Sequence, residues 1–474
     1  MTLILPDLFL VLLAFVILST DLFISGRKSE LTFHLSWSGL ALIFFILLLL
    51  PYDQNTIYLG TYKVNGISLL FKQLFVLSAL FTVLLSQSYF RPGENIRGAL
   101  KYRGEFYAII LFSTAGMFAV VSASDLLTLF IGMELATIPL YILSGYHKRD
   151  HLSVEASTKY IIMGSLATGL LLFGYSFLYG CCGSLEFSAI LAFAQQHPDH
   201  PLLLMAVFFI LAALGFKLTL FPFHMWAPDV YEGSPTPVTA FISVSSKATG
   251  IAFLLIIING PLAPLHDFLR LPLLVLAGTT MTVGNLGALR QKNLRRFMAY
   301  SSIAQAGYII MAMAGTETSA YSSIIYYLYV YGASNFAAFF IIGIVGRQRA
   351  EVFASLRGMS VQSPLLAGIL MLTMFSLGGI PPLAGFAGKF LLFGAAAEQG
   401  LYAMVVFAAL NSTVSLYYYL LLVKEAYINS VPSLSPLTIT VAQKSSLILL
   451  TAAMLLLGII PNFSTSIMNV IQGG

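Results

Sequence analysis

The stretch GFKLTLFPFHMWAPDVYEGSPTP, residues Gly215–Pro237, decides how this chain folds. It starts within an apolar run in which Lys217 has Leu, Phe and Ala residues on both sides. Pro222 has no amide hydrogen, so it interrupts the helix that the run would otherwise continue. His224 follows Lys217 by seven residues, and the two would share one face of an unbroken helix. An ionisable side chain beside a broken membrane helix is typical of an ion or proton path.

The composition indicates a polytopic membrane protein. The chain has 474 residues, of which 58% are hydrophobic and only 9% charged, and its mean hydropathy is +0.89. Soluble domains carry about 25% charged residues. The net charge of +5 is spread over short loops, which argues against nucleic acid as a partner. Cys181 and Cys182 are adjacent, which argues against a disulfide framework or a metal site.

Apolar runs of about 17–25 residues predict roughly fourteen membrane-spanning helices and no soluble domain, so residues 1–474 form one all-α membrane domain. The first run has no basic region before it and no cleavage signal after it, and is expected to be a retained helix. Residues 184–200 are expected to form an interfacial helix. The predicted spans are 3–25, 31–50, 67–88, 106–122, 125–146, 157–180, 202–222, 237–259, 272–289, 297–314, 321–345, 363–392, 401–424 and 445–465.

Basic residues predict the orientation. With the N-terminus outside, seventeen of the 24 Lys and Arg residues fall in cytoplasmic loops, whereas only Lys63 and Arg270 fall in the opposite loops. Such a bias favours an even number of spans with both termini outside. In a bacterial cell this arrangement corresponds to the inner membrane, with both termini in the periplasm.

Five lysines lie within the predicted spans. Lys72 is near a span end and is expected to extend its ammonium to the membrane surface. Lys159 follows Glu155 by four residues, which favours a structural ion pair, with a link to the proton path as the alternative. The other three have apolar sequence on both sides and are expected to be functional, because a charge at the bilayer centre costs at least ~2.5–3.5 kcal/mol. They are Lys217, Lys247 and Lys389.

Glu134 is the one carboxylate in the middle of a predicted span. It is interpreted as a partner for Lys217 on a neighbouring helix, and a buried structural acid is the alternative. A carboxylate that moves between two positions could make the lysine take up and release a proton. Asp125, near the end of the same span, is expected to cap the helix.

A second break, SLGGIPPLAGFAGKF at Ser376–Phe390, lies in the other half of the chain. Here Lys389 follows the two prolines, whereas Lys217 precedes its proline. This mirrored order predicts inverted repeats, placed at residues 106–259 and 272–424. Polar residues that could link the two halves, or serve helix packing, are Ser245, Ser246, Tyr300, Ser301, Ser302, Gln305, Tyr308 and Asn411.

The chain resembles the subunit N family of bacterial NADH–quinone oxidoreductase (respiratory complex I), whose members are antiporter-like, proton-translocating membrane subunits. The resemblance rests on five stretches: Glu155–Ser165 (EASTKYIIMGS), Phe223–Pro237 (FHMWAPDVYEGSPTP), Ala299–Tyr308 (AYSSIAQAGY), Gly379–Phe390 (GIPPLAGFAGKF) and Asn411–Leu420 (NSTVSLYYYL).

The resemblance implies a redox-silent subunit that moves protons. Glu134 would pair with Lys217, and Lys247 would pass the proton toward Lys389. Lys159, His224 and Gln305 are secondary candidates on the same path. Family members commonly carry histidine at the position of Gln305, and an amide cannot take up a proton.

The resemblance also implies partners. The chain would bind no cofactor or metal, whereas NADH, FMN, iron–sulfur clusters and quinone would belong to partner subunits of the assembly. The chain itself shows no dinucleotide fingerprint and no Cys/His metal spacing. Two alternatives remain: a subunit of a multisubunit Na⁺/H⁺ antiporter or membrane-bound hydrogenase, and a structural or quinone-site subunit.

Overall fold

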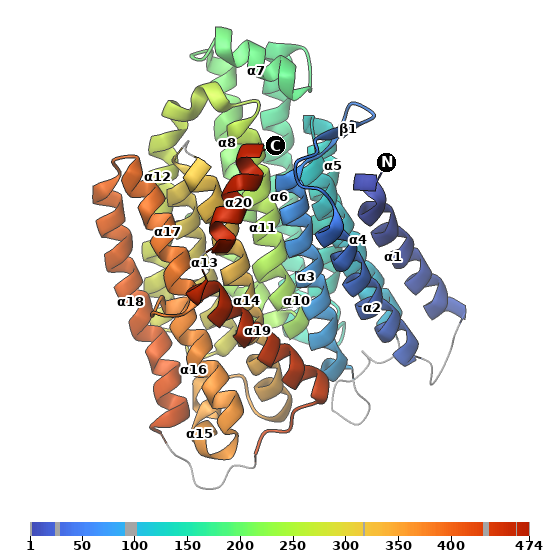
Figure 1. Ribbon diagram of the computed structural model, residues 1–474, viewed down its shortest axis with the longest axis vertical. Coiled ribbons are helices and arrows are strands. Elements are labelled where there is room, and N and C mark those ends of the chain that lie inside the picture. The colour runs from blue at the N-terminus through green and yellow to red at the C-terminus, as the bar shows by residue number, and fades with distance from the viewer. Residues whose placement is uncertain are drawn as a thin grey trace.

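The computed structural model describes residues 2–23, 29–90, 102–315, 318–429, 436–460 and 462–473, and nearly all of them are helical. The helices run side by side in one bundle, with both chain ends toward the same end of it (Figure 1). Within these residues, eleven helices are long and apolar enough to cross a membrane. The predicted all-α polytopic fold is therefore confirmed.

The remaining predicted spans, 202–222, 297–314 and 363–392, correspond to α8, to α13, and to α16 with α17. In the first half of the chain the helices are α1 (Leu5–Phe23), α2 (Ser29–Leu49), α3 (Gly66–Tyr89), α4 (Arg103–Ser122), α5 (Leu126–Ser144), α6 (His151–Cys182), α7 (Phe187–Gln196), α8 (Pro201–Lys217), α9 (Trp226–Gly233), α10 (Thr236–Phe241) and α11 (Lys247–Asn259). In the second half they are α12 (His266–Leu289), α13 (Leu294–Met313), α14 (Thr318–Gln348), α15 (Met359–Gln362), α16 (Pro364–Gly378), α17 (Ala384–Glu398), α18 (Tyr402–Tyr427), α19 (Val441–Ile459) and α20 (Asn462–Gly473).

A short hairpin between α2 and α3 departs from the helical prediction. Strands β1 (Thr56–Tyr58) and β2 (Tyr62–Val64) pair antiparallel, with Thr56 opposite Val64. Leu59 and Gly60, at the turn, both have positive φ, at 53° and 78°. Two successive residues of this kind give the backbone twist that a tight hairpin needs. The hairpin leads directly into α3.

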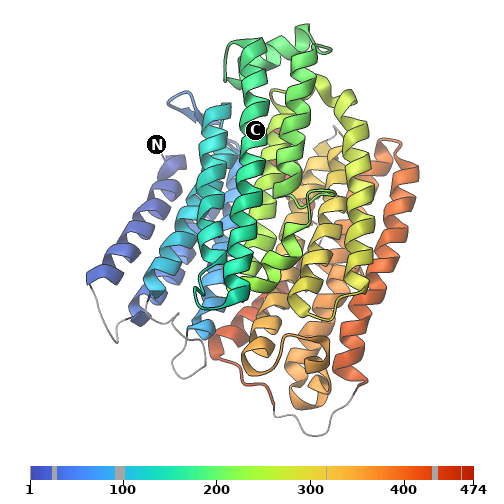
Figure 2. The same cartoon turned by 180° about the vertical axis from the view of Figure 1, so that it is seen from behind.

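The predicted cap of α5 and the predicted helix within residues 184–200 are both present. Asp125 caps α5, where its carboxylate accepts a hydrogen bond from the Thr128 amide at 2.8 Å. Cys181 and Cys182 are free thiols at the end of α6. The interfacial segment forms α7, which lies beyond α6 and α8 at one end of the bundle (Figure 2).

The first break separates α8 from α9. Helix α8 ends at Lys217, and residues 218–225 are not helical. Pro222 lacks the amide that would continue the ladder, and Thr219 has a positive φ of 59°. The tertiary packing therefore leaves Lys217 at a helix end inside the bundle.

The second break separates α16 from α17. Gly379 follows the last residue of α16 with a φ of 86°. Helices commonly end with a residue in the left-handed conformation, which glycine adopts most easily. Pro381 and Pro382 follow, and α17 begins at Ala384. Lys389 lies on α17, beyond the break, in the mirrored order that the sequence predicted.

The centre of the bundle is formed by α14 and by the span that contains α10 and α11. In an apolar 18-residue stretch of the span Thr236–Asn259, 94% of the residues are buried. In the corresponding stretch of α14, 83% of the residues are buried. One π-helical turn, Ile242–Ser246, joins α10 to α11 immediately before Lys247. Such turns leave backbone groups outside the regular ladder and are frequent at functional sites. Lys217 and Lys247 thus lie next to irregular backbone, and Lys389 lies within α17, beyond the second break.

Candidate functional site: a buried lysine axis

The three mid-span lysines are buried. Lys217, Lys247 and Lys389 are 5%, 3% and 4% exposed. In the part of the chain that the structure describes, none of them forms an ion pair with a carboxylate. Each ammonium is instead held by hydroxyl or carbonyl oxygens. The three ammonium groups therefore form a polar axis through the bundle. Among the described residues, no carboxylate is paired with any of them.

Lys217 contacts α5. Its ammonium donates to the Thr137 hydroxyl at 3.1 Å and to the Tyr141 hydroxyl at 3.3 Å. The expected contact with Glu134 is not made, because Glu134 accepts a hydrogen bond from Thr168 on α6 at 2.9 Å. Glu134, Thr137 and Tyr141 are spaced by three and four residues, so they share one face of α5. Two hydroxyls therefore lie along the helix face that separates carboxylate from ammonium.

Helices α8 and α11 bring Lys217 close to Lys247. A Cβ atom built on Gly250, one turn after Lys247, would lie 3.7 Å from the Cβ of Lys217. The Tyr141 ring also meets the Tyr160 ring edge to face at 4.7 Å between centroids. The ends of the two lysine-bearing helices are thus packed together, with aromatic rings beside them.

Lys247 contacts α13. Its ammonium donates to the carbonyl oxygen of Ser302. The Ser302 hydroxyl lies 2.9 Å from the Tyr331 hydroxyl and 3.2 Å from that of Tyr231. The neighbouring Ser301 hydroxyl lies 2.5 Å from the Tyr419 hydroxyl. This part of α13 therefore connects Lys247 to a chain of hydroxyl groups.

Gln305 is one turn further along α13 and lies between Lys247 and Lys389. Its amide nitrogen donates to the Tyr419 hydroxyl at 3.1 Å and to the Leu377 carbonyl at 3.3 Å, and its amide oxygen accepts from Tyr327. Both ends of the amide are bonded. The side chain can therefore transmit a hydrogen-bond rearrangement but cannot hold an extra proton.

Lys389 contacts both halves of the broken span and α18. Its ammonium donates to Ser412 at 3.0 Å and to the Gly378 carbonyl at 3.2 Å, and lies 5.0 Å from the centre of the Tyr308 ring. The Gly378 carbonyl is at the end of α16, where helical carbonyls have no partner in their own helix. The break thus supplies a ligand for the ammonium.

Of the three secondary candidates, Gln305 lies on this axis, and Lys159 and His224 lie outside it. Lys159 is 41% exposed in its side chain and pairs with Glu155 at 2.7 Å and with Asp229 at 2.6 Å. Asp229 also binds Arg296, so the structural ion pair is part of a charged network. His224 lies within the break and does not share a face with Lys217, because the helix ends before it. Its Nδ1 atom is buried without a partner among the described residues.

The expectation for Lys72 is wrong. Its side chain is fully buried, and its ammonium binds both carboxylate oxygens of Asp7, at 2.8 and 3.0 Å. Tyr62 donates a hydrogen bond to the same carboxylate. Asp7 lies on α1, 65 residues away in sequence, and no local pattern could have identified it as the partner.

Sequence reasoning missed several hydroxyl groups on the axis. Thr137 and Tyr141 could have been found from their helical spacing to Glu134, whereas the others come from helices distant in sequence. Of the predicted linking residues, Ser301, Ser302 and Gln305 join the axis directly, and Asn411 binds Asn285 beside it. The missed residues are Thr137, Tyr141, Thr168, Tyr327, Tyr331, Ser412 and Tyr419.

Comparison with known proteins first gives the class. The fold is that of an antiporter-like membrane subunit, and residues 123–415 match the family described as NADH:quinone oxidoreductase/Mrp antiporter, TM. A protein from Halorhodospira halophila named NADH-quinone oxidoreductase subunit N is 36% identical over 426 residues, which cover 89% of this chain and 87% of the relative. The chain belongs to the NADH-quinone oxidoreductase subunit N family.

Solved structures agree with this assignment. A chain of respiratory complex I from Thermus thermophilus with bound aureothin has a TM-score of 0.81 and 33% identity, and the match covers 96% of this chain and 97% of that one. A chain of the Mrp complex from Dietzia sp. DQ12-45-1b has a TM-score of 0.84 at 20% identity, with 98% and 96% covered. The second likeness shows the fold alone. Within the described residues there is no group of His, Cys, Asp and Glu side chains that could hold a metal ion.

Proposed function

We propose that this chain conducts protons across the membrane through Glu134, Lys217, Lys247 and Lys389, as a redox-silent subunit of an NADH–quinone oxidoreductase. The observation that carries the proposal is the burial of three lysines, each at most 5% exposed and none paired with a described carboxylate. Ionisable groups at membrane depth are costly, and they mark proton and ion paths. If these three positions served helix packing alone, apolar side chains would be sufficient there.

The contacts suggest the order of the path. Thr137 and Tyr141 link the α5 carboxylate to Lys217, and the packing of α8 on α11 brings Lys217 near Lys247. The serine and tyrosine hydroxyls of α13 and α18 then lead past Gln305 to Lys389. Because Gln305 cannot take up a proton, transfer at this position passes through the surrounding hydroxyls or through water. Lys159 and His224 lie beside this path, and the proposal assigns no transfer step to them.

The two breaks support an inverted-repeat organisation with repeats at 106–259 and 272–424. In the first repeat the lysine ends the helix before the break, and in the second it follows the break. The second break supplies the Gly378 carbonyl to the Lys389 ammonium, which is how discontinuous helices build ion sites, whereas the Lys217 ammonium binds hydroxyls of α5.

In this proposal the redox chemistry takes place in partner subunits, which carry NADH, FMN, iron–sulfur clusters and quinone. The assembly lies in a bacterial inner membrane. Both termini of this chain face the periplasm, as the distribution of Lys and Arg predicts.

The test replaces Glu134→Ala and Lys217→Ala separately in the whole complex. Proton uptake into proteoliposomes during NADH oxidation is followed with a pH-sensitive dye, and assembly is checked on native gels. A missing proton-transfer group slows that step by ~10²-fold, so pumping should fall to background while the complex still assembles. Lys148→Ala, in an exposed loop, is the matched control. The proposal is wrong if both axis variants assemble and pump normally.

The second candidate is a subunit of a Na⁺/H⁺ antiporter, because the description of the matched family also covers the Mrp antiporter. Co-purification separates the two candidates. Partners that carry flavin and iron–sulfur clusters support the first, whereas partners that are only small membrane proteins support the second.

A further inference from the structure

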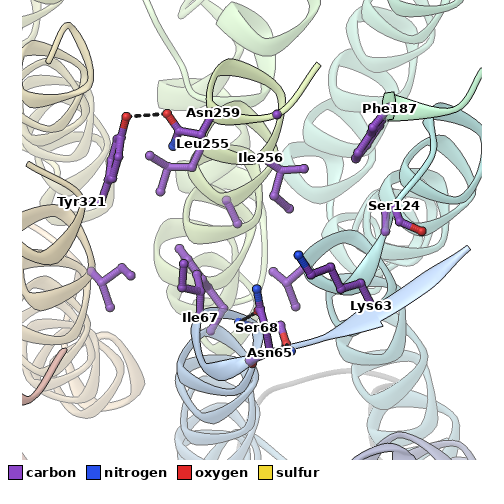
Figure 3. A pocket seen from close by; sticks show the side chains of 16 residues that line it. Lys63, Asn65, Ile67, Ser68, Ser124, Phe187, Leu255, Ile256, Asn259 and Tyr321 are labelled. Atoms are coloured by element: carbon purple, nitrogen blue, oxygen red, sulfur yellow. Dashed lines mark hydrogen bonds between the residues drawn. The ribbon is translucent and has the colours of Figure 1, made fainter. Parts of the chain in front are cut away.

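A pocket lies at the end of the bundle where α3 begins, apart from the lysine axis (Figure 3). Its volume is about 320 Å³, at the lower end of the range for small-molecule sites. It is lined by β2 and the start of α3, by the ends of α4 and α11, and by the first turns of α7 and α14. Under the proposed orientation this end of the bundle faces the periplasm.

The walls of the pocket are mostly apolar. Ile67, Leu255 and Ile256 lie around its centre (Figure 3), and Phe71 and Ile325 also line it. No Asp or Glu side chain is among the lining residues. The pocket therefore offers apolar surface to an alkyl chain and no acceptor charge to a cation.

Lys63 is the one lining residue with a charge. Its side chain extends into the pocket from β2 (Figure 3), and no carboxylate among the described residues pairs with its ammonium. Arg270, the other basic residue predicted on the periplasmic side, is bonded to the Gln399 carbonyl at 3.0 Å. An ammonium beside apolar walls is stabilised by an anion that occupies the same space.

The neighbouring polar groups also favour an acceptor-rich ligand. The Asn259 side-chain oxygen accepts a hydrogen bond from Tyr321, so its amide nitrogen is left to donate (Figure 3). The Asn65 side-chain oxygen accepts from the Ser68 amide at 2.9 Å, as the cap of α3. Local contacts thus occupy the two side-chain amide oxygens, whereas the Lys63 ammonium and the Asn259 amide nitrogen remain as donors.

We propose that this pocket binds an amphiphile whose anionic head contacts Lys63 and whose alkyl chain lies along Ile67, Leu255 and Ile256. A small soluble anion would leave the apolar walls uncovered, and a neutral apolar molecule would leave the ammonium unpaired. Two sources share the required chemistry: an acidic phospholipid of the outer leaflet, with one chain inserted, and a free fatty acid.

The test uses the whole complex in nanodiscs with two probes, a diazirine-bearing fatty acid and a diazirine-bearing phosphatidylglycerol. Peptide mass spectrometry locates the label. Labelling is expected at the start of α3 and the end of α11 with at least one probe. In Lys63→Gln it should fall about tenfold, since a charge-assisted hydrogen bond is lost. Lys148→Gln, the same change in an exposed loop at the other end, should have no effect.

Ile256→Trp is the second variant, because it fills the pocket while Lys63 remains. It should also reduce labelling. If only one of the two probes labels the pocket, that probe identifies the source of the amphiphile. Labelling that persists in both variants overturns the proposal. So does complete competition by millimolar inorganic phosphate, because the alkyl chain would then contribute nothing.

Discussion

The buried pair Asp7–Lys72 permits a quantitative prediction about how α1 is attached to the rest of the bundle. Asp7 is on α1 and Lys72 on α3, and their two nitrogen–oxygen distances are 2.8 and 3.0 Å. The Lys72 side chain is fully buried, and that of Asp7 is 13% exposed. Asp7→Ala removes the carboxylate and leaves an unpaired ammonium under α1.

Removing one partner of such a pair costs ~3–5 kcal/mol, because the remaining charge stays buried. Each ~1.4 kcal/mol changes an equilibrium tenfold. The population in which α1 is detached should therefore rise by at least ~10²-fold. In the double variant Asp7→Leu/Lys72→Met both charges are replaced by apolar groups, and the change should be small.

The assay measures detachment directly. Leu3 is 1% exposed next to α1, and Leu3→Cys in a background without Cys181 and Cys182 gives a single buried thiol. Its rate of modification by a water-soluble maleimide reports how often this end of the chain opens. Asp7→Ala should raise the rate by at least ~10²-fold, and the double variant should restore it. Equal rates in all three proteins would show that the ion pair does not hold α1.

Three further outcomes are expected. Gln305→His adds a titratable group between Lys247 and Lys389, and the coupled pumping rate should be retained or increased; complete loss would contradict a path that can use a titratable group at this position. Ser412→Ala removes a hydrogen bond to the Lys389 ammonium worth ~1.5–3 kcal/mol, so pumping should fall about tenfold or more in proteoliposomes while the complex still assembles. Burial lowers the pKa of His147 below its ordinary 6.5, against the opposing effect of Asp150, so the folded protein favours the neutral ring. The stability that this provides is present above about pH 6.5 and is lost as the pH falls through the lowered pKa, so the melting temperature of the complex should drop at acidic pH, and less so in His147→Asn.

Irregular backbone lies beside two of the mid-span lysines. At Lys389 the break supplies the Gly378 carbonyl, and the π-helical turn before Lys247 similarly interrupts the regular ladder. A continuous helix would satisfy these carbonyls internally. Backbone irregularity at membrane depth is tolerated only inside protein or beside a wet cavity, and here it lies inside the bundle.

Local sequence determined the spans and their interruptions. Apolar runs specify membrane helices because no unpaired backbone group is tolerated in lipid, and Pro222, Pro381 and Pro382 indicate where two of these helices are interrupted. Proline alone is not sufficient, since Pro139 lies within α5 and Pro272 within α12. The three mid-span lysines could also be identified from the sequence. The free-energy cost of a charge in the membrane depends on its depth and not on its partner.

Only the tertiary structure decided what each of these groups contacts. Lys217 binds hydroxyls on α5 instead of Glu134, and Lys72 is paired with Asp7 instead of reaching the surface. Lys63 lines a pocket to which helices from across the chain contribute. A hydrogen bond or an ion pair depends on distances of a few ångströms between helices, and these distances are set by packing across the whole bundle, which no local pattern encodes.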